Sequence, residues 1–391
     1  MAARDDSYDV LVCGGGIAGV AAALEAARSG QRTALLEKTI LLGGLATAGL
    51  IWGYPPLYDA NGAKVTAGLA EELLQLACRY GPGGTDPSRL GVDWTIFSPA
   101  AFVLALDEAL LGAGVEIWLD TLVCQPVMEG NCVRGVEAET KAGRVTLTAR
   151  VIIDATGDAD IAHRSGAACV TAGNLMAMWA LQASLARARQ AVEKQDGAQV
   201  MEMLILGDSL LDREAWASAK TWTGLDAGSV TAFVLAGRRL LRERIAKAQS
   251  SGARSDQYPL MLPALAQFRT TRRIVGRATI APGEHDRPRP DSIGMVADWR
   301  APEHVWEIPY GALVPDGVRG LLVAGRCIAA EEDPWEATRV ITPVAVTGQA
   351  AGLAAALAVA QGVSPSDVPA DAIQAQLEAR GIPYHRSGPG R

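Results

Sequence analysis

The chain has 391 residues, of which 49% are apolar and 20% charged, and its net charge is −7. This length exceeds one ordinary domain, and the composition is that of a folded protein with a large core, not of a disordered one. There is no basic excess to neutralise phosphates, which excludes a nucleic acid as the main partner. The six cysteines form no C-x-x-C pair and there are only four histidines, so we expect neither a metal site nor a disulfide framework.

The first residues, MAARDDSYDVLVCGGG, contain no basic segment followed by an apolar one. We therefore expect no secretory signal, a cytoplasmic location and reduced thiols. Residues 340–366 carry no charge and are long enough to span a bilayer. Because this stretch contains Pro343, Thr347 and Gln349 among many alanines, we expect a buried helix and no membrane partner.

Residues 8–37 predict a βαβ unit. The run YDVLVC (8–13) is typical of a buried strand, IAGVAAALEAARSG (17–30) of an Ala-rich helix, and RTALLE (32–37) of a second buried strand. Such a unit begins a doubly wound parallel sheet. The expected fold class is therefore α/β.

Between the first strand and its helix, Gly14, Gly16 and Gly19 follow the pattern G-x-G-x-x-G. The first glycine permits a tight turn, the second lets the backbone approach a pyrophosphate, and the third lets helix and strand pack closely. Glu37 ends the second strand, where a carboxylate can accept hydrogen bonds from both ribose hydroxyls and would repel a 2′-phosphate. Together these features predict a dinucleotide site that disfavours NADP.

The next segments predict more of the same domain. Residues 39–58 are uncharged and rich in small residues, which indicates a buried loop against a large apolar ligand. Residues 65–80 and 99–112 are helical in pattern, and the short β-rich runs of residues 116–157 indicate an antiparallel meander that ends in the glycine turn of VIIDATG.

The remainder predicts an insertion and a return to the first domain. Residues 173–268 have a helical pattern interrupted by glycines, residues 321–326 (LLVAGR) indicate a last buried strand, and residues 343–362 a closing helix. We expect a discontinuous domain made of residues 1–170 and 317–363, an inserted mostly helical or mixed substrate domain at 171–316, and a C-terminal tail with a short helix at 364–391. The oligomeric state cannot be read from the sequence.

An ordered set of motifs resembles the FAD-dependent oxidoreductase family, within the glutathione-reductase-like flavoproteins. The motifs are Cys13–Gly19, Glu37-Lys38, GGLATAG (43–49), DATGDADIA (154–162), RTTRRIVG (269–276), DSI (291–293), IPYGALVP (308–315), LLVAGRC (321–327) and TGQAAGLAAA (347–356). The resemblance covers both ends of the chain and hardly touches residues 173–268. A second G-x-G-x-x-G after a strand is absent, so we expect no separate NAD(P)H domain.

The resemblance implies that FAD is the cofactor and assigns residues to it. The implied cofactor-binding residues are Gly14, Gly16, Ile17, Ala18, Gly19, Glu37, Lys38, Gly43, Gly44, Leu45, Ala46, Thr47, Val123, Thr156, Gly157, Asp158, Gly325, Arg326, Thr347, Gly348 and Gln349. The helix entered at Thr347-Gly348-Gln349 is expected to point its positive end at the flavin pyrimidine.

A flavin implies an oxidoreductase, most simply one that oxidises a small or medium organic substrate by hydride transfer to flavin N5. The alternatives are a flavin-dependent monooxygenase and a non-catalytic protein of the same fold. The sequence AGRCIA at the last glycine turn departs from the G-D-A-x-H that is typical of aromatic hydroxylases.

The candidate catalytic residues lie in the last third of the chain. His304 is a candidate base and Tyr310 a candidate donor to a substrate oxygen. Glu332 lies where related sequences often carry a histidine, and Arg339 precedes an apolar run. Arg339, or the group Arg269, Arg272 and Arg273, could hold a substrate carboxylate. Tryptophans 299, 306 and 335 could wall an aromatic substrate.

Overall fold

The computed structural model describes residues 7–81, 89–208, 221–250 and 256–386. Its main sheet has seven strands, of which the parallel ones run in the order β5-β2-β1-β8-β16. These are β1 (Ser7–Cys13), β2 (Thr33–Leu36), β5 (Glu116–Trp118), β8 (Gly143–Asp154) and β16 (Leu321–Val323).

The predicted meander is formed by β6 (Leu122–Glu129), β7 (Cys132–Thr140) and the first half of β8. The second half of β8 pairs in parallel with β1 and β16. One long strand therefore joins the meander to the parallel sheet, and the predicted α/β class with a parallel sheet and a meander is confirmed.

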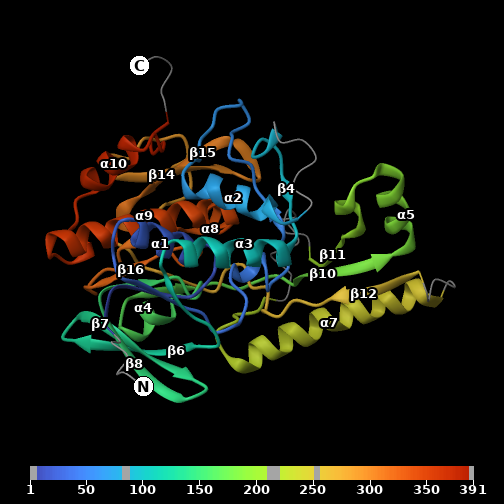
Figure 1. Cartoon of the computed structure of the whole chain (residues 1–391), viewed down its shortest axis with the longest axis horizontal. Helices are drawn as coiled ribbons and strands as arrows, with labels where there is room; N and C mark the ends of the chain where they lie inside the picture. Colours follow the sequence, from blue (N-terminus) through green and yellow to red (C-terminus); the bar gives the residue numbers. More distant parts are fainter. Residues whose placement is uncertain (1–6, 82–88, 209–220, 251–255, 387–391) are drawn as a thin grey trace.

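Two helices, α1 (Ile17–Arg28) and α9 (Ile341–Gln361), pack against each other beside this sheet (Figure 1). A Cβ added at Gly348 would lie 2.2 Å from the carbonyl oxygen of Ala18, and one added at Gly352 would lie 2.4 Å from that of Ala22. The helices can approach this closely only because these positions are glycines. By length and composition α9 could cross a membrane, but 78% of its apolar window is buried inside the protein, as the prediction of a buried helix requires.

Further helices and short strands complete this part of the chain. They are α2 (Leu69–Arg79), α3 (Pro99–Gly112), α4 (Asp160–Arg164), α8 (Glu332–Thr338) and α10 (Ala370–Ala379), the strands β3 (Gly53–Tyr54) and β4 (Thr95–Ile96), and the 3₁₀ turns η1 (Gly44–Ala46), η4 (Tyr310–Leu313) and η5 (Pro365–Asp367).

The inserted region extends to one side of the molecule (Figure 1) and is built around its own antiparallel sheet of order β11-β10-β12. Its elements are β10 (Ala177–Ser184), α5 (Leu185–Lys194), η3 (Gly197–Val200), β11 (Glu202–Gly207), α7 (Ala227–Ser250) and β12 (Gln257–Met261). The helical pattern expected for residues 173–268 was therefore wrong over these strands. The apolar run AMWALQAS is short, and a short apolar run fits a buried strand as well as a helix.

The insertion is closed at its base by β9 (Cys169–Thr171) pairing with β13 (Arg272–Ile274). After it, β14 (Ser292–Asp298) and β15 (Ala301–Pro309) form a hairpin whose Ile293, Trp306 and Ile308 join the same hydrophobic core as β1 and α9. The predicted boundary at residue 316 therefore does not separate two cores, because the chain has already returned to the main core at β13.

All six cysteines are free thiols. Cys13 and Cys327 are fully buried, and burial raises the pKa of each thiol well above its ordinary value. Both are small apolar packing residues, Cys13 at the end of β1 and Cys327 in the turn that follows β16.

Candidate functional site

A cavity of about 460 Å³ lies at the carboxyl ends of the parallel strands. Its wall contains Gly14 after β1, Glu37 after β2, Ala155 after β8 and Ala324 after β16. Open α/β sheets bind their ligands at this edge, and the volume is in the usual range for a small-molecule site.

The first glycine turn is shaped for a phosphate. Gly14 has a φ of +107°, and a Cβ there would lie 2.5 Å from the carbonyl oxygen of Ala155. A Cβ at Gly16 would meet nothing within 4 Å, so the backbone there borders open space. Gly16 is also the N-cap of α1 and provides no capping side chain. The free N–H groups of the first turn can therefore hold a pyrophosphate.

The carboxylate of Glu37 is fixed at the end of β2. One oxygen accepts from the Gly15 N–H at 2.7 Å and the other from the Thr39 N–H at 2.8 Å. The side chain is buried and lines the cavity. This places an acceptor beside the glycine turn, as a ribose site requires.

Arg326 joins the second and third glycine turns. Its Nε donates to the Gly157 carbonyl at 2.5 Å, its Nη1 donates to the Phe268 carbonyl at 2.6 Å, and its Nη2 pairs with Asp158. Burial alone raises the pKa of Asp158, but Arg326 and the hydrogen bond from Thr271 outweigh it and the pKa is lowered. Asp158 is thus a carboxylate held ionised beside the cavity.

Most of the predicted cofactor residues come together in this cavity. Those that line it are Gly14, Gly16, Ile17, Ala18, Glu37, Lys38, Gly43, Gly44, Leu45, Ala46, Val123, Thr156, Gly157, Asp158, Gly325 and Arg326. Gly19 lies behind the wall, where a Cβ would come within 1.8 Å of the Gly14 carbonyl oxygen. Thr47 also lies behind the wall and donates to the Leu42 carbonyl.

The prediction for Thr347, Gly348 and Gln349 needs correction. Helix α9 begins at Ile341, so these residues lie in its interior, where Gly348 packs against α1 and Gln349 bonds to α1 and α2. The Thr347 hydroxyl accepts from the Gly325 N–H at 3.0 Å and so supports the third glycine turn from behind. The residues at the start of α9 that reach the cavity are Ile341 and Val344, with Arg339 just before them.

Of the four predicted catalytic residues, only Arg339 lines the cavity. Glu332 is exposed at the start of α8. Tyr310 is buried elsewhere, where its hydroxyl donates to the Pro365 carbonyl at 2.6 Å and burial raises its pKa. Neither side chain lines the cavity, because order along the chain does not fix which side chains face it. None of the tryptophans 299, 306 and 335 lines it either.

His304 is also outside the cavity, on the β14–β15 hairpin. Its Nδ1 and that of His285 lie 2.8 and 3.0 Å from the same carboxylate oxygen of Asp286. These three atoms lie close enough together to hold a metal ion, but the guanidinium of Arg386 pairs with the other oxygen of Asp286. The cluster is therefore already supplied with positive charge, and the role of His304 as a base for the cavity is not supported.

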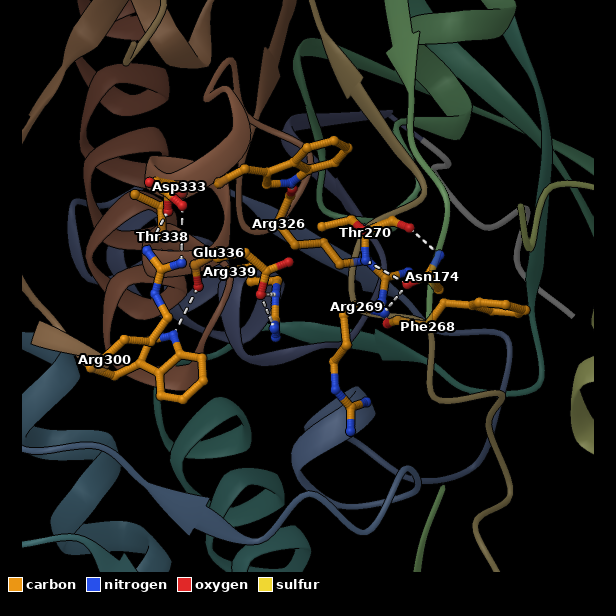
Figure 2. A network of polar contacts seen from close by, with 12 residues as sticks. Asn174, Phe268, Arg269, Thr270, Arg300, Arg326, Asp333, Glu336, Thr338 and Arg339 are labelled. Atoms are coloured by element: carbon orange, nitrogen blue, oxygen red, sulfur yellow. Dashed lines mark hydrogen bonds and ion pairs between the residues drawn. The ribbon is translucent and has the colours of Figure 1, made fainter. Parts of the chain in front are cut away.

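Sequence reasoning missed the contribution of the segment before β13. Residues Ala264, Leu265, Ala266 and Phe268 form part of the cavity wall. The next residue, Arg269, is buried, and Figure 2 shows its guanidinium turned away from Asn174 and Arg326. The signal for this segment in the sequence was the basic group at residues 269–273. The sequence does not show in which direction these side chains point.

A glycine turn with an open helix end, a fixed carboxylate on the next strand and two further glycine turns define a dinucleotide-binding α/β protein of the flavoprotein type. The chain belongs to the FAD dependent oxidoreductase family, whose model matches residues 9–177 and 182–377. FAD is accordingly its cofactor, and the glycine turns, Glu37 and Arg326 are the residues that would hold it.

Two similar proteins are both named as reductases. A digeranylgeranylglycerophospholipid reductase of Methanoculleus marisnigri is 25% identical over 187 residues, which is 41% of this chain and 42% of the relative, so less than half of that protein is matched. A geranylgeranyl bacteriochlorophyll reductase-like protein of Thermoplasma acidophilum aligns with a TM-score of 0.54 and 15% identity, covering 96% of this chain and 84% of that one. This second likeness shows the fold alone.

Proposed function

We propose that this FAD-dependent oxidoreductase oxidises a small or medium organic substrate by removing a hydride from a substrate C–H. The observation that supports this proposal is the composition of the cavity wall. The glycine turn and Glu37 share the wall with Arg339 and with Ala264, Leu265, Ala266 and Phe268 at the end of the insertion. Cofactor and substrate can therefore meet in one continuous space. When bound, FAD supplies the two-electron acceptor.

The protein's own residues supply binding and shape. Leu45, Ala46, Leu265, Phe268 and Ile341 make much of the wall apolar, which excludes water from the reacting atoms. Arg339 binds or orients the substrate and accepts no proton, because a guanidinium stays protonated. Among the described residues, no histidine, tyrosine or cysteine lines the cavity. A proton released by the substrate would therefore pass to a carboxylate of the wall, to Lys38 or to water.

The purified protein tests the proposal directly. Oxidised FAD is coloured, so we expect a yellow protein whose visible absorbance is lost when it is mixed without oxygen with an oxidisable substrate. A panel of alcohols, amines and hydroxy acids would identify the class. Bleaching by none of them, or incorporation of labelled dioxygen into the product, would reject the dehydrogenase or oxidase assignment in favour of another flavin reaction.

A further inference from the structure

Arg269 is a buried cation whose guanidinium has an unused donor. Its side chain lies just before β13, and the residue is only 7% exposed. Nη1 donates to the Gln267 carbonyl at 2.8 Å, but Nη2 has no hydrogen-bond partner. Among the described residues, no carboxylate forms an ion pair with it. A buried charge in this state costs free energy unless something else compensates it.

The neighbours of Arg269 add to the positive charge that lacks a negative partner. Arg339 and Arg326 are close enough to act on it electrostatically, and burial followed by the charge of Arg339 lowers the pKa of Arg269 to about 9. Glu336 opposes this effect, but its carboxylate already accepts from Arg339 Nε at 2.8 Å. Asp158 is likewise taken by Arg326. The group therefore holds three guanidinium groups and two carboxylates.

A second unused donor lies beside the first. The Arg269 Cζ is 5.7 Å from the centre of the Trp179 ring, and Trp179 Nε1 is buried without a partner. The side chain of Gln267 fixes the backbone of Trp179. Its amide oxygen accepts from the backbone N–H of Trp179 at 2.7 Å, and its amide nitrogen donates to the backbone carbonyl of Trp179 at 3.0 Å. An arginine and an indole nitrogen can only donate hydrogen bonds. The missing partner must therefore be an acceptor.

The positive charge of the arginines and their position in the fold narrow the choice of this acceptor. A water molecule would satisfy a donor but not the extra positive charge, whereas an anion satisfies both. Phe268, the residue next to Arg269, and Arg339 both line the cavity. Arg339 is itself only 7% exposed in its side chain. Arg339 therefore faces the cavity directly, whereas Arg269 is buried behind the wall and adjoins it through Phe268, its neighbour in the chain.

We propose that Arg269, together with Arg339, binds the carboxylate of the substrate, so that the substrate is a carboxylic acid with an apolar body. This inference rests on the proposed function, because it names the substrate class for the same cavity. Arg269 fixes the position of the carboxylate, and the apolar wall receives the remainder of the molecule.

The test uses the FAD-loaded protein and ligands that need not react. Phenylacetate and hexanoate are titrated beside phenylacetamide and hexanamide, with binding followed by the absorbance change of the bound FAD and by calorimetry. We expect each carboxylate to bind at least about tenfold more tightly than its amide, since charge-assisted hydrogen bonds are worth that much or more. Equal binding of acid and amide would overturn the inference.

Variants separate Arg269 from a general loss of charge. We expect Arg269→Gln to abolish the preference for the carboxylate and to keep a full complement of FAD. The control Arg319→Gln, which removes a surface arginine paired with Asp367, should keep the preference. Retention of the preference in Arg269→Gln would overturn the inference. A shifted FAD potential with unchanged carboxylate binding would also overturn it, and would show that Arg269 serves the cofactor.

If Arg269→Gln fails to fold, Arg269→Lys and Arg339→Gln carry the test. Each should weaken carboxylate binding by about tenfold without changing amide binding, and unchanged carboxylate binding in both would overturn the inference. Because these ligands need not be oxidised, a negative result leaves the proposed function standing. Conversely, a substrate panel that never bleaches FAD removes the proposed function without affecting the measured preference.

Discussion

Gln349 and Glu25 are joined inside the contact between α9 and α1 by a hydrogen bond of 2.9 Å from Nε2 to Oε2. The amide oxygen of Gln349 also accepts from the Leu69 N–H at 2.9 Å. One buried side chain therefore links α1, α2 and α9. Its role is to hold the helices that support the glycine turns, and it does not touch the cavity.

We expect Gln349→Ala to lower the free energy of unfolding by about 1–3 kcal/mol, because it leaves the Leu69 N–H without its partner and the buried Glu25 carboxylate with only Arg380 and Ser29. Urea unfolding would measure this, and the FAD spectrum of the folded variant should be unchanged. The control Gln361→Ala changes an exposed glutamine on the same helix and should cost less than about 0.5 kcal/mol. A normal stability with an altered FAD spectrum would instead restore the original prediction that Gln349 contacts the flavin.

Gly19 and Gly14 give a second prediction. A methyl group at position 19 would collide with the Gly14 carbonyl oxygen, so we expect Gly19→Ala to shift the opening turn, lower stability by about 1–3 kcal/mol and reduce the FAD retained after purification. Gly112→Ala is the control, since a Cβ there meets nothing within 4 Å. It should be neutral or slightly stabilising. Full FAD retention in Gly19→Ala would show that the turn does not depend on this close contact.

The sequence predicted what depends on neighbours along the chain. The first turn, its helix and Glu37 lie within residues 8–37, and their spacing alone identifies the dinucleotide site. Strand β10 was harder to predict than the first turn. It is buried along most of its length, so its sequence shows no alternation of polar and apolar residues.

The catalytic end of the site depends on contacts across the chain. Arg269 is placed by β13 pairing with β9, about a hundred residues earlier in the sequence. His304 was favoured for its chemistry, but the β14–β15 hairpin carries it to Asp286 and away from the cavity. Residue type alone could not separate these two outcomes, because only the tertiary structure decides which side chains face the cavity.

Asp286 predicts a pH dependence of stability. Burial raises its pKa, but hydrogen bonds from His285 and His304 outweigh this and lower the pKa from 3.8 to about 2. A carboxylate whose pKa is lower in the folded state stabilises the fold above its ordinary pKa, and this contribution is lost as the pH falls from 3.8 to about 2. We expect Asp286→Asn to flatten the loss of stability in that interval, as measured by thermal unfolding across pH.

A double variant checks the cause of that shift. His285→Gln with His304→Gln removes the two ring donors and leaves the carboxylate in place. It should also flatten the acid side of the stability profile, because the pKa of Asp286 would return toward its ordinary value. If the double variant keeps the wild-type slope, Arg386 and the Val305 N–H, which also contact Asp286, are sufficient to hold the shift.

The last prediction concerns Glu336, which neutralises part of the positive charge that the proposed carboxylate site uses. Its side chain is 13% exposed and pairs with Arg339. Glu336→Gln removes a negative charge beside two arginines, so the FAD-loaded variant should bind phenylacetate about fivefold more tightly. The same change should lower the free energy of unfolding by about 1–3 kcal/mol, because Arg339 loses its partner in the unliganded protein.

The two measurements on Glu336→Gln should therefore move in opposite directions, which general damage to the fold cannot produce. The control Glu378→Gln, at an exposed position of α10, should change neither quantity. Weaker phenylacetate binding in Glu336→Gln would mean that Glu336 orients Arg339 toward the ligand and does not compete with the ligand for it. In that case the carboxylate site would depend on the geometry of Arg339 more than on the surplus positive charge of the cluster.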